Sequence, residues 1–317
     1  MVGKIENFYI PMIMNGKIIL LSIISLLIFS SCEKNSESRG EEMPQLFEEG
    51  KISGPLIDYG LDISADGKEV FFARSEGAWG KGPVVSRIYS SQFESGSWSE
   101  PRIASFSGQE DDGEPFLSKG GDSLFFTSKR PWGEQEVSQD IWLVVRNEEG
   151  DWGEAFPLPL GINSPAREYS PKINSDGDFY FISDRSGGMG QGDIYVIPDF
   201  LSGGDSIINL GPRINSEKGE WNLGFDKGGD VMVFEASERP ENKSPYGDLY
   251  ISFRKGGVWS FPQNMQELNS SGSDLCPAFS GEYLYYSSSD SLASTTTQIY
   301  RFKITDLLEQ YRQSAKW

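Results

Sequence analysis

The sequence predicts an all-β fold built from five copies of one four-stranded unit, and three observations lead to it. The 317 residues include 36 Gly, 17 Pro and 13% aromatic residues, with 37% apolar residues overall, which is typical of short strands joined by many turns. Five segments of similar pattern recur at a nearly constant spacing. Aromatic positions also recur at nearly fixed offsets within these segments.

The five repeats align on the last aromatic residue of an apolar run. These anchor residues, spaced by 54, 55, 53 and 52 positions, are Phe72, Phe126, Phe181, Phe234 and Tyr286. A second apolar run ending in an aromatic residue follows each anchor, and three repeats then carry a Gly-x-Trp strand with Trp98, Trp152 or Trp259. Four antiparallel strands in a unit of this length form one blade of a β-propeller. We therefore expect five four-stranded blades, with six blades, one of them irregular and N-terminal, as the alternative.

Three short motifs of the third repeat resemble a known family. Ser175-Asp176-Gly177, Ser183-Asp184-Arg185 and Asp193-Ile194-Tyr195 are similar to the WD40-like beta-propeller repeat of the TolB type. The resemblance covers residues 46–304 and implies propeller architecture rather than a particular activity. Repeats 4 and 5 depart from the pattern, because both lack the Asp-Gly turn.

The ends of the repeat region predict how the ring closes. After the third strand of repeat 5 the sequence reads TDLLEQYRQSAK, which predicts a short C-terminal helix within residues 305–317, with Thr305 as its N-cap. The fourth strand of this blade is therefore missing. We expect the segment from Phe47 to Pro55 to supply it, which would join the two ends and remove an open sheet edge.

The N-terminal region resembles the leader of bacterial lipoproteins. Residues 18–29 form an apolar run that is too short for a membrane span, and Phe29-Ser30-Ser31-Cys32 resembles a lipobox. We therefore interpret residues 1–32 as a signal peptide, with translation starting at Met1 or Met14, and residues 33–45 as a flexible tether. The resemblance implies a lipid on Cys32 and a place in the cell envelope as an outer-membrane lipoprotein, on either face of that membrane.

Composition excludes several functions. The formal charge of −19 argues against a nucleic-acid partner, since phosphate contacts need Lys and Arg. The absence of histidine excludes Ser-His and Cys-His mechanisms and His-ligated metals. No Gly-x-Ser-x-Gly elbow or P-loop is found either.

One column of the alignment is acidic in all five repeats, 12–14 residues before each anchor. Its members are Asp58, Asp112, Glu168, Glu220 and Asp274. They precede the innermost strands and would surround one mouth of the central channel, where carboxylates suit a sugar or Ca²⁺, the one cofactor that the sequence suggests. The alternative, which we favour, is that each acid caps backbone N–H groups of a neighbouring loop.

Two further sets of residues recur. Arg130, Arg185 and Arg239 are expected to pair with aspartates of the same blades, either as an internal Arg–Asp bond or as an anion-binding row; these aspartates are Asp140, Asp193 and Asp248. The three tryptophans are expected to pack between blades rather than to stack on sugars.

These features predict a lipid-anchored envelope propeller that binds a protein or a glycan as a scaffold and is not an enzyme. The alternative is a carbohydrate-active enzyme of the glycoside-hydrolase type that uses carboxylates at the channel mouth. An asymmetric pair of buried acids with raised pKa values in the inner loop of one blade would favour the enzyme.

Overall fold

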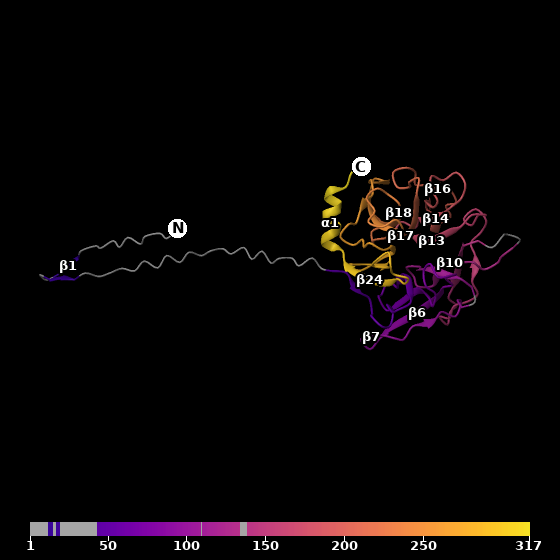
Figure 1. Ribbon diagram of the computed structural model, residues 1–317, viewed down its shortest axis with the longest axis horizontal. Helices are drawn as coiled ribbons and strands as arrows, with labels where there is room; N and C mark the ends of the chain where they lie inside the picture. Colours follow the sequence, from indigo (N-terminus) through magenta and orange to yellow (C-terminus); the bar gives the residue numbers. More distant parts are fainter. Residues whose placement is uncertain (1–11, 15–16, 20–42, 109, 134–137) are drawn as a thin grey trace. The chain divides into compact units, whose positions relative to one another are not determined.

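The computed structural model describes residues 12–14, 17–19, 43–108, 110–133 and 138–317, in two units, Met1–Glu41 and Glu42–Trp317. In the first unit β1 (Met12–Met14) pairs antiparallel with β2 (Lys17–Ile19). Cys32 and most of the predicted leader and tether lie outside the described residues. The second unit consists of five antiparallel sheets and one helix, so the prediction of a five-bladed propeller is confirmed (Figure 1).

Each blade begins with an innermost strand, and the innermost strands of neighbouring blades contact one another around the ring. These strands are β4 (Ile57–Ile63), β9 (Asp112–Leu117), β13 (Glu168–Ile173), β17 (Gly219–Phe225) and β22 (Asp274–Ser280). The second strands, which carry the aromatic anchors, are β5 (Glu69–Ser75), β10 (Ser123–Ser128), β14 (Phe179–Ser183), β18 (Val231–Ser237) and β23 (Tyr283–Ser288).

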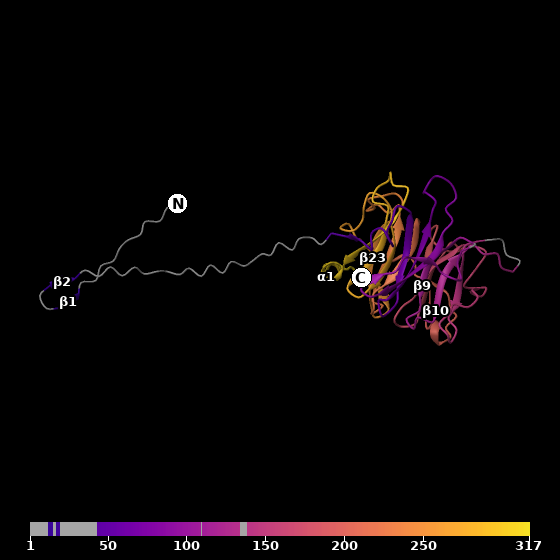
Figure 2. The same ribbon diagram turned by 90° about the horizontal axis from the view of Figure 1, so that it is seen from below.

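The third strands are β6 (Arg87–Glu94), β11 (Asp140–Val145), β15 (Asp193–Ile197), β19 (Asp248–Lys255) and β24 (Gln298–Lys303). The outer strands are short: β7 (Ser97–Trp98) with β8 (Arg102–Ile103), β12 (Phe156–Pro157), β16 (Ile208–Asn209), β20 (Val258–Trp259) with β21 (Gln263–Asn264), and β3 (Gln45–Leu46). A 3-10 turn, η1 (Phe200–Ser202), follows β15. Figure 2 shows the strands with their connecting loops above and below.

The hydrophobic core lies between the blades, because each sheet buries both faces against its neighbours. The anchor residues Phe72, Phe126, Phe181 and Phe234 are fully buried. Trp98 packs edge-on against Phe47, and Trp152 does the same against Phe71 of the preceding blade. Trp259 belongs to one cluster with Tyr180 of the preceding blade. The prediction that the tryptophans pack between blades is therefore confirmed.

The ring closes as expected, through an N-terminal strand in the fifth blade. β3 pairs antiparallel with β24, two residues before the start of the segment predicted for this role. The Phe47 N–H donates to the Ile299 carbonyl at 2.8 Å, and the Ser53 hydroxyl donates to the same carbonyl at 2.7 Å. In Figure 1 the yellow β24 accordingly lies beside the indigo beginning of the second unit.

The C-terminal helix α1 (Thr305–Ser314) is also confirmed, with one correction. Its N-cap is Ile304 rather than Thr305, and no side chain caps it, because Thr305 already has helical backbone geometry. Leu307 is buried in the cluster shared by blades 4 and 5. The Gln263 side chain donates to the Tyr311 carbonyl at 3.0 Å, which holds the helix against the outer edge of blade 4.

Replacing Phe47 with alanine should destabilise the propeller by about 3–5 kcal/mol, because it removes a buried ring at the closure seam. Met43, which is 71% exposed, is the control: Met43→Ala should change stability by less than about 0.5 kcal/mol. Urea unfolding of both variants provides the comparison. Equal stability of the two would mean that the fifth blade does not depend on the N-terminal strand.

Candidate functional site

The five recurring acids are fully buried at the start of the innermost strands. Each occupies the first or second position of its strand: Asp58 in β4, Asp112 in β9, Glu168 in β13, Glu220 in β17 and Asp274 in β22. Each accepts hydrogen bonds from its own blade or from the loop that leads into it. The acids are thus drawn into separate blades rather than toward one shared point.

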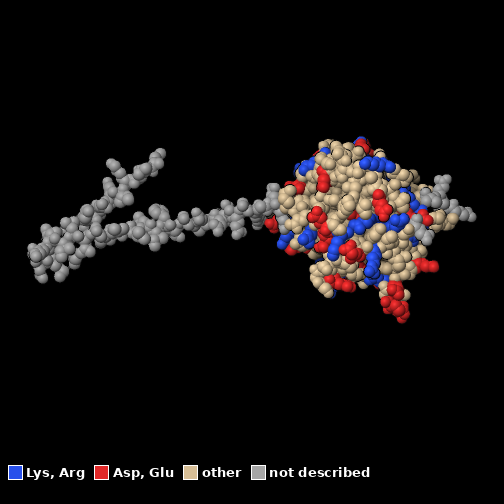
Figure 3. Space-filling view, turned by 60° about the horizontal axis from the view of Figure 1, so that its bottom comes forward, with Lys and Arg blue, Asp and Glu red and all other residues tan. Residues whose placement is uncertain are grey.

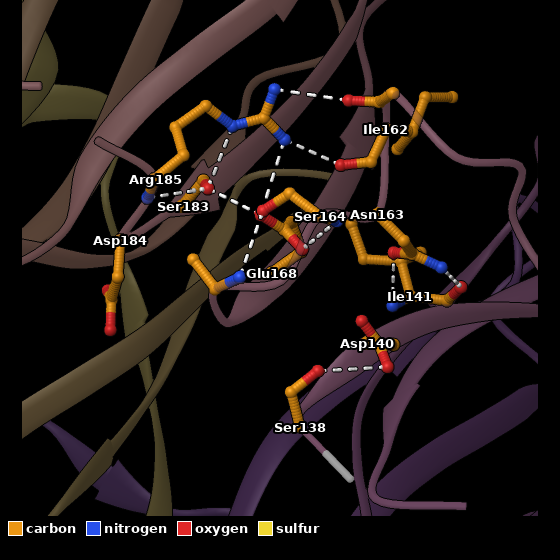
Figure 4. Close-up of polar contacts among 12 residues, drawn as sticks. Ser138, Asp140, Ile141, Ile162, Asn163, Ser164, Glu168, Ser183, Asp184 and Arg185 are labelled. Carbon is orange, nitrogen blue, oxygen red and sulfur yellow. Dashed lines mark hydrogen bonds and ion pairs between the residues drawn. The ribbon is translucent and has the colours of Figure 1, made fainter. Parts of the chain in front are cut away.

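Glu168 shows the arrangement in full (Figure 4). Its carboxylate accepts from the Ser164 N–H at 2.7 Å and from the Ser183 hydroxyl at 2.6 Å. Arg185 lies 3.2 Å from the same carboxylate and also donates to the Gly161 and Ile162 carbonyls of the entering loop. Burial raises the pKa of Glu168, while the serines and Arg185 oppose that rise. The acid therefore joins an inner hairpin to the loop arriving from the preceding blade.

Blades 1, 2 and 4 repeat this contact with their own arginines. Arg74 lies 2.5 Å from Asp58, Arg130 lies 2.8 Å from Asp112, and Arg239 lies 2.6 Å from Glu220. We call the four buried pairs, including Arg185–Glu168, the blade locks. The capping alternative is met by Asp58, Glu168, Glu220 and Asp274, which accept from backbone N–H groups of the entering loops, whereas among the described residues Asp112 accepts only from side chains. A ligand site formed by the five acids stays a prediction. In the part of the chain that the structure describes, no group of three or more Cys, Asp or Glu side chains is arranged to hold a metal ion.

The predicted pairing of Arg130, Arg185 and Arg239 with Asp140, Asp193 and Asp248 is wrong. The arginines reach the inner-strand acids instead, and the three aspartates bind groups of their own blades. Asp193 accepts from the Met189 N–H and from Asn209, while Asp140 accepts from the Trp132 indole at 2.8 Å. Asp248 accepts from the Lys243 N–H at 2.8 Å and from Asn264 at 2.9 Å.

Blade 5 differs from the other four. Asp274 accepts from the Ser270 N–H at 2.6 Å, but no arginine or lysine pairs with it among the described residues. Its Oδ1 atom is buried without a hydrogen-bond partner. Burial raises the pKa of Asp274 from its ordinary value of 3.8 to about 6.

A β-bulge follows each acid and turns one residue per blade into the central channel. The register between the first and second strands shifts at the same place in all five blades. The residues two positions after the acids are Gly60, Glu114, Ser170, Asn222 and Cys276, and all five line one small cavity. Four of them have left-handed backbone geometry, with φ between 48° and 65°. The backbone at this point is thus repeated, but the side chain differs in every blade.

The channel residues are hydrogen-bonded to one another across blades. Glu114 accepts from the Ser170 N–H at 2.8 Å, and Asn222 donates to Glu235 of β18 at 2.9 Å. Cys276 donates through its sulfur to the Asn222 side-chain oxygen at 2.5 Å. These bonds link blade 2 to blade 3 and blade 4 to blade 5. They are made by side chains that each occur in only one of the five repeats at this position.

Two acids of this hydrogen-bonded network, Glu114 and Glu235, have strongly raised pKa values. Burial raises the pKa of Glu114 to about 7, although the nearby Lys172 cation opposes the rise. Burial also raises the pKa of Glu235 well above its ordinary range, and the negative charges of Glu114 and Asp274 raise it further. Glu114 in blade 2 and Glu235 in blade 4 thus have raised pKa values and break the repeat symmetry, but they lie in different blades and Glu114 is only half-buried, so they are not the pair within one inner loop that would mark an enzyme.

Glu235 also lines an open cleft of about 300 Å³. The other lining residues are Gln191, Trp221, Ser237, Glu238, Pro245, Tyr246 and Ser273. Glu235 is only 6% exposed, whereas Tyr246 is 62% exposed. Trp221 stacks on Tyr169 and donates its indole N–H to the Ser237 hydroxyl at 2.9 Å. The cleft thus combines aromatic faces, hydroxyl and amide groups and one buried carboxyl.

Glu114 and Glu235 could not be found by looking for repeat positions that hold an acid in every repeat. Glu114 occupies a column that otherwise holds Gly, Ser, Asn and Cys. Glu235 directly follows the anchor Phe234, where the other repeats have Ala, Thr, Ile and Ser. An acid that appears once in an otherwise uncharged column was the signal available.

The surface and the described helix give two further observations. On the face that Figure 3 shows, Lys and Arg side chains lie among Asp and Glu side chains rather than in one basic patch. Within the described residues, no helix has the length and apolar character needed to cross a membrane.

Comparison with known proteins finds similar solved structures at low identity. The chain matches no protein-family model and no curated protein. It resembles the catalytic domain of a GH62 α-L-arabinofuranosidase from Coprinopsis cinerea, at 10% identity and a TM-score of 0.48, covering 82% of this chain and 96% of that one. A glycosyl hydrolase from Bacteroides ovatus is similar at 9% identity and a TM-score of 0.45, covering 79% and 85%.

Peptidases also contain the same fold. The β-propeller domain of the Trilobed protease from Pyrococcus furiosus is 14% identical, with a TM-score of 0.39 and coverage of 77% and 68%. The chain spans only 37% and 36% of two similar puromycin-hydrolysing peptidases. At these identities each likeness concerns the fold alone.

The prediction that the protein is not an enzyme is contradicted by these comparisons. The similar solved structures include glycoside hydrolases and peptidases, at low sequence identity. The prediction also rested on the absence of residues that break the repeat symmetry, and Glu114 and Glu235 do break it. We therefore withdraw the non-catalytic interpretation.

The blade locks predict unequal effects of removing single carboxylates. Asp112→Asn should destabilise the protein by about 3–5 kcal/mol, because it leaves the largely buried Arg130 without its counter-charge. Asp274→Asn should instead stabilise it above pH 7, by up to about 3 kcal/mol, since the raised pKa of Asp274 makes its ionised form unfavourable in the fold.

The sign follows from linkage. An acid whose pKa is raised on folding contributes stability below pH 3.8 that is lost as the pH rises to about 6. Urea unfolding at pH 4.5 and pH 7.5 should therefore show the gain of Asp274→Asn mainly at the higher pH. The same measurements with calcium and with chelator test the ion site, because a calcium-dependent gain that a single acid substitution removes would favour it over capping.

Proposed function

We propose that the protein is a carbohydrate-active enzyme of the glycoside-hydrolase type, with its reaction site in the cleft floored by Glu235. One observation carries the proposal: a buried carboxyl with a raised pKa borders an open cleft, and a second such carboxyl, Glu114, belongs to the same channel network. Perturbed acids in a cleft are a mark of functional sites.

The two carboxyl groups fit the two roles that glycoside hydrolysis requires. Burial and the negative charges of Glu114 and Asp274 raise the pKa of Glu235 and so favour its protonated form, which would donate its proton to the glycosidic oxygen as the bond to the anomeric carbon breaks. Glu114, with a pKa of about 7 and Lys172 nearby, is substantially ionised at that pH. Glu114 lines the small channel cavity and not the cleft, so the water that attacks the anomeric carbon would have to reach that cavity to give Glu114 its proton, which completes the balance of the reaction.

The lining of the cleft favours a neutral sugar. Neither lysine nor arginine is among the lining residues, so an anionic sugar would find no counter-charge there. Tyr246 presents an exposed ring on which the apolar face of a sugar can stack, and Gln191 and Ser237 supply hydrogen-bonding groups. An uncharged glycan of the cell envelope is therefore the partner that we propose.

Glu235→Gln should lower kcat/KM on neutral glycans by at least about 10²-fold, since the amide cannot donate an acidic proton. Stability should change little, because the amide resembles the protonated acid in size and polarity. Release of reducing ends from a glycan panel, together with thermal melting, measures both effects. Glu94→Gln, on an exposed position of β6, is the matched control and should retain full activity. An equally active Glu235→Gln variant, or an inactive wild type across the panel, would contradict the proposal.

We also propose that the protein is a lipoprotein of the outer membrane and a member of the TolB-type propeller family. The lipobox-like sequence ending at Cys32 and the repeat motifs support this, and neither rests on the comparisons. A lipid on Cys32 would hold the propeller at the membrane through an acidic, polar tether.

Cys32→Ala should abolish metabolic labelling with palmitate and move the protein from the membrane fraction to the soluble fraction. Cys276→Ala is the control, because that cysteine is buried in the channel and inaccessible to lipid transfer. Continued labelling of Cys32→Ala would disprove the anchor.

A further inference from the structure

We propose that Asp274, left without a cationic partner in blade 5, is a positioning residue that keeps Glu235 in its protonated form for the reaction. The proposal rests on the function proposed above and adds the device that sets the protonation of the acid. The missing blade lock, the substituted loop contact and the closeness of Asp274 to Glu235 support it.

The first step is that Asp290 occupies the place of the lock arginine. The N–H groups of Arg130, Arg185 and Asp290 donate to the hydroxyl of the serine two residues earlier, at 3.2, 3.1 and 3.0 Å. Each of these serines pairs across the hairpin with the buried acid of its blade. Asp290 therefore holds the chain position of the blade 2 and 3 arginines, so blade 5 has an acid there instead of a cation. Its φ of 57° gives it a different backbone conformation, and its carboxylate accepts from the Tyr300 hydroxyl at 2.8 Å.

The second step is that in blade 5 a cation binds carbonyls of the entering loop, but among the described residues no cation pairs with the buried acid. In the other blades the arginine also binds carbonyls of the entering loop, as Arg130 does with Phe106. In blade 5 the carbonyl equivalent to that of Phe106 belongs to Leu268, and it accepts from the Tyr286 hydroxyl at 3.5 Å. Lys243, between β18 and β19 of blade 4, donates to the nearby Gln266 and Asn269 carbonyls of the same loop at 2.7 and 2.8 Å. The loop is therefore held by a cation that makes no ion pair with Asp274, so the loop contact is retained while the charge neutralisation is not.

The third step connects Asp274 to Glu235. The Asp274 N–H donates to the Gly247 carbonyl at 2.9 Å. A Cβ atom on Gly247 would lie within 2.2 Å of the Glu235 Oε1 atom, so the Glu235 carboxyl rests on the Gly247 backbone. Only one residue thus separates the two acids, and their charges interact in a poorly solvated interior.

The groups around the two acids are negative or neutral except for the Lys172 cation, which lies beside Glu114 and Cys276 in the small channel cavity. Around Glu235 they are Glu114 of β9, Asp274 and Cys276 of β22, and Asn222 of β17. Around Asp274 they are Asp248 of β19, Ser270 and Ser288. Within these surroundings, ionised Asp274 raises the pKa of Glu235, which is the direction that a general acid at neutral pH needs.

Restoring the arginine tests this device. The arginine of Asp290→Arg should pair with Asp274 and raise the melting temperature at pH 7.5. It should also lower the proton affinity of Glu235 about tenfold, which moves the alkaline limb of the kcat/KM profile about one unit to lower pH. The titration of the Glu235 carboxyl, followed by carbon NMR, should move by the same amount. Asp290→Asn is the matched control, because it removes the native charge without adding a cation and tolerates the φ of 57° at this position.

A second variant is needed because arginine at position 290 would have to adopt a strained, left-handed backbone conformation. Asp274→Asn removes the charge itself and should lower the pKa of Glu235 in the same direction as Asp290→Arg. An unchanged Glu235 titration in both variants would overturn the proposal, even if activity persists. The titration needs no substrate, so it still tests the role of Asp274 if the wild-type protein hydrolyses none of the glycans and the proposed function fails.

Discussion

The buried contact between an inner-strand carboxylate and an arginine of the same blade is the interaction on which the rest of the propeller depends. It joins the paired first and second strands of a blade to the loop that arrives from the preceding blade. Burying two charges is costly, and only close pairing with further hydrogen bonds offsets that cost. The blade locks meet this requirement because the arginine also binds loop carbonyls and the acid also binds N–H or hydroxyl groups.

This constraint lets the channel vary. Since the locks and strand pairing fix the backbone on both sides of the β-bulge, the bulge residue is held in place whatever its side chain. Gly60 illustrates the extreme case, because its backbone lies against that of Glu114 and its φ is 65°. The repeats can therefore keep one architecture while five different residues face the channel, and a glutamate in one blade acquires surroundings that no other blade provides.

The contrast between a repeated architecture and channel residues that differ in every blade also explains what could be predicted from the sequence. The aromatic anchors and tryptophans recur because every blade must bury the same faces, so their spacing predicted the blade number, the interblade packing and the closing strand. The partners of Arg130, Arg185 and Arg239 were mistaken because spacing along the chain does not show which of two carboxylates a long side chain reaches. Glu114 and Glu235 were missed for a different reason: recurrence identifies what every blade needs, whereas a reacting group is needed once. Their depth in the channel depends on the bulge, and register shifts of this kind leave no mark in apolar periodicity.

The same acidic column holds two opposite solutions to burying a carboxyl. In blades 1 to 4 an arginine compensates the charge, so the acid stabilises the fold by tying a hairpin to a loop. In blade 5 the compensation is absent among the described residues, and Asp274, Glu235 and Glu114 all have raised pKa values. Their combined contribution to stability therefore declines as the pH rises through their folded-state values, and near neutral pH the propeller is less stable than its architecture alone would allow. A loss of folding stability is expected where acids must keep or exchange a proton. The uncompensated charge of Asp274 destabilises the fold, and the same charge raises the pKa of the neighbouring Glu235 so that it can donate a proton.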